Sequence, residues 1–500
     1  MKRDIIRKIT DSQSHIKSNH GAPLNRRELF GAGYLAVGGL VLLPRVGSLF
    51  GETAFAAEAC AAGGESSRNM SAVLQLDLGG GATLPFNFPP MSVTGEPLNS
   101  GSYTTLGMTA LTDPRAVTLD TTFGIPMNPN SRILQGMRQE LGFNDPAQAA
   151  NAAAMAARVN GYITCVSNSD DTQNNEHNLL MGLPKLGYNR LIASLGDTDN
   201  ANGSGGRSAP VADWFDAARI PVTVARREDA LNIVLPPVLK DYLPSKSYSK
   251  VTEMIKRWST AQQSYFLSQP ESQQIEIIKR LADKECAYQE SGALVSKYGP
   301  TAVDIDLDPI VDFRTIWTAD KGTGSIVKLL ADNIAVGGVV TMGGYDYHGQ
   351  GGATQNARDL EAGVMLGKMI RSFCLKGKNA MISIITDGGT ASGGTTEDAN
   401  QQRIAATGDS GQRGMRVTFF INGAGTARPG MTRSLKQFGG YNNTGAVDTG
   451  ADTLFSTSPA KCCAIDLLNL LKFDGNLDLA KNLDLPDPAK YAIMEETKPS

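Results

Sequence analysis

The segment that most constrains the fold is residues 339–349, where a short apolar run ends in two glycines and is followed by Asp346 and His348. Residues 339–342 are uncharged and rich in β-branched side chains, which predicts a buried strand. Asp346 and His348 then lie in the loop after the carboxyl end of that strand. Open α/β sheets bind ligands at this position, so the segment predicts both a fold class and a site.

The pattern continues along the chain. Residues 356–375 have the apolar periodicity of a helix. The residues expected on its apolar face are Leu360, Val364, Ile370 and Cys374. Residues 380–386 predict a second strand, which delivers Asp387 into another glycine-rich loop. Strand, acidic loop, helix, strand and acidic loop thus follow one another, which is typical of an α/β domain.

An earlier segment, residues 72–78, predicts a strand with Asp77 near its carboxyl end and three glycines after it. Asp77 is either a loop cap or part of the site, while the glycines allow a close approach of the backbone. Further strands are expected at residues 162–166, 191–195 and 416–421, and further helices at 133–141, 147–157, 324–334 and after Ser458. Residues 390–408 and 423–447 are expected to be loops, and the alternating acids of 304–308 an exposed edge.

Residues 1–56 are expected to be an export signal and not part of the fold. They contain a twin arginine, Arg26 and Arg27, then an uncharged run at 30–43, and small residues at 54–56 that suit cleavage. This pattern favours the twin-arginine route and a periplasmic or secreted protein. An uncleaved membrane anchor is the alternative, although the run is short for a bilayer and no span is expected in the mature chain.

The mature chain is expected to be one α/β domain at residues 72–480, after a flexible start at 57–71 and before a C-terminal tail at 481–500. Residues 249–298 have the texture of two helices and are expected to be a helical insertion. The whole chain has a net charge of −3, and the signal is basic, so the mature part is acidic. An acidic surface argues against nucleic acid as a partner.

Histidine restricts the chemistry. Of four histidines, only His177 and His348 lie outside the signal, which excludes a histidine-rich dizinc centre. A metal site would need oxygen ligands, which suit calcium, magnesium or manganese. His177 lies in a polar loop after the strand at 162–166 and is either a site residue or a hydrogen-bonded structural residue. No haem, iron–sulfur or nucleotide motif is present, so no organic cofactor is expected.

The six cysteines all lie outside the signal and allow disulfides in an oxidising compartment. Cys374 is expected to be a buried thiol because it belongs to an apolar helix face. Cys462 and Cys463 are adjacent and would point in different directions on a helix, which predicts that one of them pairs elsewhere. No C-x-x-C spacing occurs, which argues against a thiolate zinc site or a thioredoxin-like pair.

The order of these segments resembles a family of twin-arginine-exported proteins, domain of unknown function 1501, in the alkaline phosphatase and sulfatase superfamily. The resemblance rests on the strand before Gly79, on Asp346 and His348 after a later strand, and on Asp387 after the next strand. It extends to Asp409-Ser410-Gly411, where the family has Asp-His-Gly. The chain therefore lacks one imidazole of the family pattern.

The resemblance implies an alkaline-phosphatase-like three-layer α/β sandwich that holds one divalent cation: calcium, magnesium, manganese or zinc. The ligands are expected to be some of Asp77, Asp346, His348, Asp387 and Asp409. The implied reaction is hydrolysis of a small phosphate or sulfate ester, with Thr390 or Ser410 attacking or orienting water. The alternative is a non-catalytic pseudo-hydrolase that binds an envelope protein. A third hypothesis, an exported redox protein, has only the twin-arginine signal in its favour.

Overall fold

The computed structural model describes residues 68–109, 118–167, 178–188, 190, 192–197, 222–234, 303–398, 403–450, 456–483 and 485–497. Nearly all of them belong to one compact unit made of residues 62–231 and 298–500. The expected signal, the expected helical insertion and His177 lie outside the described residues. Within the described ranges no helix is both long and apolar enough to span a bilayer.

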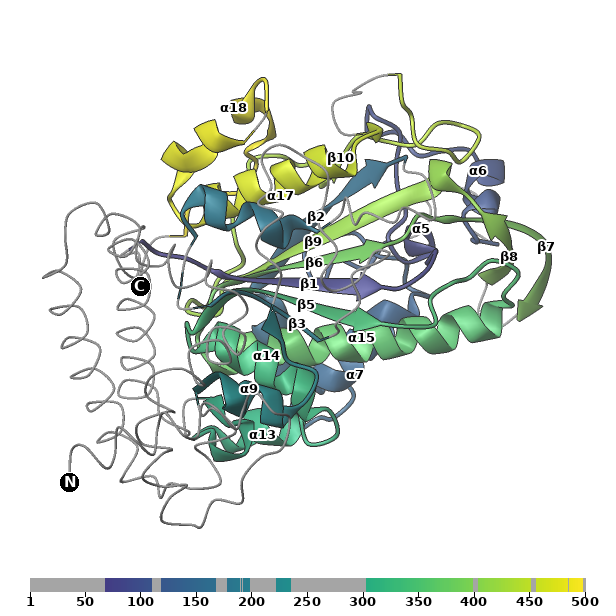
Figure 1. The fold of residues 1–500 in the computed structure, drawn as a ribbon. Helices are drawn as coiled ribbons and strands as arrows, with labels where there is room; N and C mark the ends of the chain where they lie inside the picture. The colour runs from purple at the N-terminus through teal and green to yellow at the C-terminus, as the bar shows by residue number, and fades with distance from the viewer. Residues whose placement is uncertain are drawn as a thin grey trace, which may run out of the picture. The chain divides into compact units, whose positions relative to one another are not determined.

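The unit is built on an eight-stranded sheet with the order β10-β2-β9-β6-β1-β5-β3-β4 (Figure 1). Its strands are β1 (Ala72–Leu78), β2 (Val159–Val166), β3 (Ile192–Gly196), β4 (Val222–Thr223), β5 (Ala335–Met342), β6 (Ala380–Thr386), β9 (Gly414–Ile421) and β10 (Gln437–Phe438). Every neighbouring pair is parallel except those of β9, which is antiparallel to β2 and β6. The predicted α/β class is confirmed, and β1 and β6 begin and end where the sequence predicted.

Helices cover both faces of the sheet (Figure 1). One face packs against α17 (Pro459–Phe473), where Phe420 of β9 and Phe473 stack edge to face at 5.3 Å. On the other face lie α14 (Lys321–Ala331) and α15 (Gly352–Leu375). Gly338 of β5 allows α14 to approach, because a Cβ there would lie 2.8 Å from Ile326 Cγ2. The connection β5–α15–β6 is the crossover that parallel strands require.

The other elements are α5 (Leu84–Asn87), α6 (Ser100–Thr105), α7 (Arg132–Leu141), α8 (Ala149–Ala156), α9 (Arg227–Val234), α13 (Val311–Ile316), α18 (Pro488–Tyr491), η2 (Leu179–Gly182), η3 (Pro184–Leu186), η4 (Ile305–Leu307), η5 (Gly411–Arg413), η6 (Leu477–Asn482), β7 (Thr390–Asp398) and β8 (Arg403–Asp409). The strands β7 and β8 form a separate two-stranded antiparallel sheet. The prediction of a loop at residues 390–408 is therefore wrong. Threonine favours strands, and Ile404 and Ala406 are buried, so this polar segment still has an inward face.

The apolar face predicted for α15 is only half correct. Ile370 and Cys374 are buried, but Leu360 and Val364 are only partly so. Part of the contact surface is made by small residues instead, since a Cβ on Gly363 would lie 2.2 Å from Ile133 O of α7. A search for large apolar side chains misses a helix contact that depends on glycine.

Residues 304–308 are not an exposed edge. Asp304 pairs with Arg227 through two contacts, with Oδ2 2.5 Å from Nη2. Asp308 is almost completely buried and its Oδ2 lies 2.6 Å from Lys328 Nζ, with Lys376 Nζ on the same oxygen. The acids at 304 and 308 form ion pairs, and the pair of Asp308 with Lys328 is buried on both sides. The alternation in the sequence did not reveal these pairs, because the basic partners belong to other segments.

Both ends of the expected domain are packed. Met70 and Ser71, from the segment expected to be flexible, are buried, and Asp474 accepts a hydrogen bond from Ser71 N at 2.9 Å. In the expected tail, Met494 is buried and donates its backbone N–H to Asn469 Oδ1 at 3.0 Å. These parts of the terminal segments belong to the folded unit.

The described cysteines are Cys165, Cys374, Cys462 and Cys463, and all four are buried thiols. The prediction for Cys374 is confirmed, and burial raises its pKa to about 11. The prediction that Cys462 or Cys463 pairs in a disulfide is wrong in this structure. Both thiols belong to α17 and lie in the core, where Arg416 Nη1 donates to Cys463 Sγ at 3.3 Å.

Candidate metal centre

Two carboxylates and an imidazole converge beyond the carboxyl ends of the central strands. Asp346 and His348 lie in the loop after β5, and Asp409 ends β8. His348 Nδ1 is hydrogen-bonded to Asp346 Oδ1 and lies 3.6 Å from Asp409 Oδ1. One donor atom from each residue lies within 4.8 Å of the other two, and all three side chains are exposed to solvent. Three of the five predicted ligands therefore meet.

Alternation along the loop after β5 turns Asp346 and His348 outward. Tyr345 and Tyr347 are both fully buried, with ring centroids 5.9 Å apart. The Tyr345 hydroxyl donates to Arg358 O, and the Tyr347 hydroxyl donates to Asp359 Oδ1, both at 2.8 Å. Because successive side chains of an extended segment point to opposite sides, the tyrosines that anchor the loop also present the acid and the imidazole.

The glycines after β1 bind this loop through backbone hydrogen bonds. Tyr345 N donates to Gly79 O and Tyr347 N donates to Gly81 O, both at 3.2 Å. Gly80 has a φ of +112°, and a Cβ at this position would lie 2.4 Å from Asp346 N. Only glycine fits here, because a side chain would overlap the backbone of the loop.

The hairpin places the third ligand and the two predicted nucleophiles. Thr390 is in register with Asp409, but it is buried and its hydroxyl is hydrogen-bonded to that of Thr83. Ser410 follows Asp409 and is less buried, and its Oγ accepts a hydrogen bond from Arg413 Nη1 at 2.8 Å. Thr390 thus supports the hairpin from inside, whereas Ser410 lies beside the cluster.

The remaining predicted ligands are near this edge but outside the group of three. Asp77 is completely buried and is in register with Thr341 of β5. Asp387 follows β6, is half-buried, and donates its backbone N–H to Gly80 O at 3.0 Å. Among the described residues, only Asp346, His348 and Asp409 bring their donor atoms this close together.

Two residues of this edge were not predicted. Asp197 follows β3, and its Oδ2 accepts a hydrogen bond from Thr341 N at 2.6 Å. Burial raises the pKa of Asp197 to about 6. The sequence pattern that could have identified Asp197 is the one that identified Asp77, namely an acid at the end of a short apolar run. Arg413, which contacts Ser410, gave no comparable signal, since it lies in a polar segment without periodicity.

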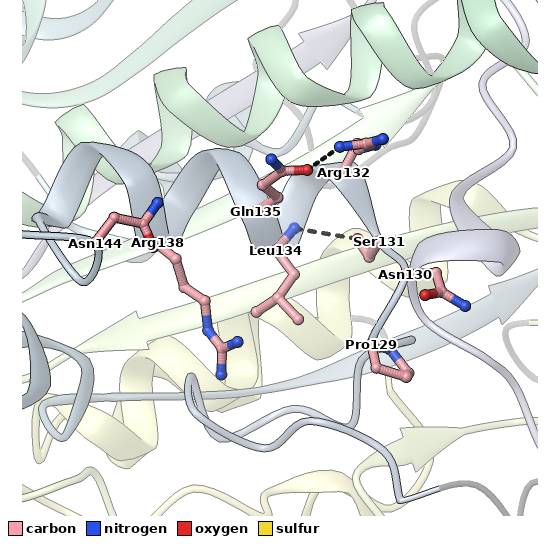
Figure 2. Close-up of a pocket in the computed structure, with 8 residues that line it drawn as sticks. All are labelled: Pro129, Asn130, Ser131, Arg132, Leu134, Gln135, Arg138 and Asn144. Atoms are coloured by element: carbon pink, nitrogen blue, oxygen red, sulfur yellow. Dashed lines mark hydrogen bonds between the residues drawn. The ribbon is translucent and has the colours of Figure 1, made fainter. Parts of the chain in front are cut away.

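A separate cavity of about 340 Å³ lies along α7, with a lining that runs from Pro129 before the helix to Asn144 after it (Figure 2). Its lining includes Arg132, whose guanidinium bonds to Gln135, and Ser131, whose Oγ caps the helix by accepting from Leu134 N at 3.1 Å. None of the predicted site residues lines it. Its other basic residue, Arg138, pairs with Asp120 and donates to Thr122 Oγ1 at 2.9 Å. The lining contains no acid, histidine or cysteine, so we assign no catalytic role to it.

Comparison of the chain with family models, curated proteins and solved structures gave no match. The resemblance to the alkaline phosphatase superfamily therefore remains an expectation drawn from the sequence.

The donor set fits a divalent cation. Two carboxylate oxygens and one imidazole nitrogen suit manganese or zinc better than calcium or magnesium, which prefer oxygen alone. His348 Nδ1 and Asp409 Oδ1 lie 3.6 Å apart. One ion can bridge this separation, because metal–ligand bonds of roughly 2.0–2.2 Å place two ligands up to about 4.4 Å from each other. The solvent-exposed side of the cluster leaves room for water or a substrate as further ligands.

Proposed function

We propose that Asp346, His348 and Asp409 hold one divalent cation in an exported protein of alkaline-phosphatase-like fold, and that this site hydrolyses a phosphate or sulfate ester. The observation that carries the proposal is the convergence of the three side chains from two separate segments. Their position beyond the carboxyl ends of parallel strands supports it, since this is where such sheets bind ligands.

The cluster is unlike an ion pair kept for stability. Its side chains are 38% to 55% exposed, and exposed pairs contribute only about 0–1 kcal/mol. Meanwhile Tyr345, Tyr347 and Gly80 fix the backbone around it. A rigid support under weakly interacting exposed groups favours a ligand site.

A cation would compete with the proton that links His348 to Asp346. Nδ1 of His348 can donate a proton to the carboxylate or bind an ion, but it cannot do both. Binding at Nδ1 therefore requires that the proton move to Nε2 in the neutral ring or leave a protonated ring. Because acid favours the protonated ring and protonated carboxyl groups, the apparent affinity should fall as the solution becomes more acidic.

The residues around the cluster suit an anionic ester. A bound divalent cation would polarise an ester oxygen and stabilise the charge that develops on it. Arg413 offers a guanidinium that can bind another oxygen of the same group. Ser410 is the hydroxyl best placed to attack or to orient water, because its oxygen accepts from Arg413 and its proton is left to donate.

The test is the metal content of the purified protein and its affinity for Mn²⁺ by titration calorimetry. Asp346→Asn combined with His348→Ala should abolish binding while the fold remains. Asp304→Asn is the control, because Asp304 pairs with Arg227 and should not affect metal content. Binding unchanged in the double variant would overturn the proposed site, and binding lost in the control would mean that other acids form it.

Turnover needs a second measurement, with aryl phosphate and aryl sulfate as substrates and Ser410→Ala as the variant. The non-catalytic alternative, a pseudo-hydrolase, is favoured by the buried hydroxyl of Thr390, which leaves Ser410 as the one predicted nucleophile beside the cluster. Metal binding without hydrolysis of either ester would select that alternative. Hydrolysis that is unchanged in Ser410→Ala would indicate direct attack by water.

A further inference from the structure

The buried carboxylate of Asp359, on α15, lies between the two segments that carry the candidate ligands. Asp359 is 1% exposed. Its Oδ1 accepts from the Tyr347 hydroxyl at 2.8 Å, and its Oδ2 accepts from Asn87 Nδ2 at 2.7 Å and from Arg403 Nη1. Both carboxylate oxygens are thus used inside the core.

The two main partners of Asp359 belong to different ligand-bearing segments. Tyr347 lies between Asp346 and His348 in the loop after β5. Arg403 begins β8, the strand that Asp409 ends. Arg403 is fully buried, and its guanidinium carbon lies 4.3 Å from the ring centroid of Phe86 and 5.6 Å from that of Tyr347.

A backbone contact reinforces the same connection. Ala406 N of β8 donates to Gln350 O at 3.1 Å, and Gln350 N donates to Tyr347 O at 2.9 Å. The loop and the hairpin are therefore in direct contact as well as sharing one buried carboxylate. A shift of Tyr347 or Arg403 would change the spacing of Asp409 from His348.

We propose that Asp359 is a positioning residue of the candidate metal centre, which sets the distance between the Asp346–His348 loop and Asp409 by holding Tyr347 and Arg403 on one carboxylate. This inference rests on the proposed function. Groups behind metal ligands orient them, and removing such groups typically weakens metal binding about 10–100-fold.

The fold contains a matched control. Asp466 of α17 is also fully buried, accepts from a buried tyrosine hydroxyl at 2.8 Å (Tyr162), and pairs with a buried arginine (Arg416). This second set lies in the core between α17 and the strands β2 and β9, and it includes no residue of the loop after β5 or of β8. Tyr347→Phe and Tyr162→Phe each remove one buried hydroxyl from a buried carboxylate–arginine pair. Asp466 Oδ1 keeps a hydrogen bond from the Thr418 hydroxyl at 2.9 Å in the second variant.

The experiment compares Tyr347→Phe and Tyr162→Phe by thermal unfolding and by Mn²⁺ titration. Both variants should lower the melting temperature, because each removes a buried hydrogen bond to a carboxylate. Only Tyr347→Phe should weaken Mn²⁺ binding, by about tenfold. Equal Mn²⁺ affinity in the two variants would overturn the positioning role. Asp359→Asn and Asp466→Asn form a second pair with the same expected contrast, and the phenylalanine variants keep the test valid if these do not fold.

Hydrogen exchange distinguishes a failure of this inference from a failure of the proposed function. Tyr347→Phe should increase amide exchange in both residues 343–350 and residues 403–409, whereas Tyr162→Phe should leave both segments unchanged. If the wild type binds no Mn²⁺, the proposed function is overturned, and the exchange data still decide whether Asp359 connects the segments. Unchanged exchange in Tyr347→Phe would refute that connection.

Discussion

Gly80→Ala should disrupt the candidate site by pushing away the loop that carries Asp346. Gly80 has a φ of +112°, and an added Cβ would lie 2.4 Å from Asp346 N, 2.6 Å from its Cα and 2.7 Å from its Cβ. Contacts this short cannot persist, so the loop or the glycine segment must move. The obstacle is backbone, which two hydrogen bonds from Tyr345 and Tyr347 fix in place.

The cost has two parts that a control separates. A non-glycine residue at positive φ costs roughly 1–2 kcal/mol. Relief of the overlap with the loop adds about 1–3 kcal/mol, the usual range for overpacking. Gly377 at the end of α15 has a φ of +61°, and a Cβ added there would have nothing within 4 Å. Gly377→Ala should therefore show the first part alone.

Urea unfolding of both variants measures these terms, and Mn²⁺ titration reports on the site. We expect Gly80→Ala to lose about 2–5 kcal/mol of unfolding free energy and to bind Mn²⁺ more weakly than wild type. Gly377→Ala should keep its affinity. Equal losses of stability in the two variants, or unchanged affinity in Gly80→Ala, would refute the close contact between Gly80 and the loop.

Two further predictions concern buried charges. The pKa of Asp197 is about 6 in the folded state, above its ordinary value of 3.8. Between these two pH values the folded state retains a proton that the unfolded chain releases. The free energy of unfolding should therefore fall as the pH rises from 3.8 to 6. Asp197→Asn should remove this loss of unfolding free energy. In urea unfolding, the variant should be more stable than wild type by roughly 1–3 kcal/mol at pH 7 but not at pH 3. A pH dependence like that of wild type would contradict this prediction. Lys328→Met should lower the free energy of unfolding by about 3 kcal/mol, because it removes one of the two lysines that contact the buried Asp308. A loss below ~1 kcal/mol would show that Lys376 alone compensates the charge of Asp308.

Six of the eight strands of the sheet could be predicted because their signal is local. The two-residue strands β4 and β10 were not predicted, and β10 lies in residues 423–447, which were expected to be a loop. Residues 72–78 and 380–386 are short apolar runs bounded by polar or glycine residues, and they form β1 and β6 with those limits. The hairpin of β7 and β8 was missed, because its threonines and glycines resemble a loop until a buried face is known. The ion pairs of residues 304–308 were also missed, because their basic partners Arg227, Lys328 and Lys376 belong to other segments.

The candidate site was also predicted only in part. The sequence was enough to predict that acids follow strands at one edge of an α/β sheet, and its five candidate ligands include Asp346, His348 and Asp409. Only the folded chain shows that these three are the ones whose donor atoms meet. Asp409 reaches His348 because β8 folds back over the loop, while Asp77 is enclosed in the sheet.

Asp359 shows why the sequence could go no further. Nothing in the sequence indicates that Tyr347 and Arg403 both bind the carboxylate of Asp359. An acid on a helix is usually solvated. Apolar periodicity is a property of neighbours in the chain, so it can be read from the sequence. The pairing of buried charges depends on which distant segments pack together, and only the folded chain brings those segments into contact.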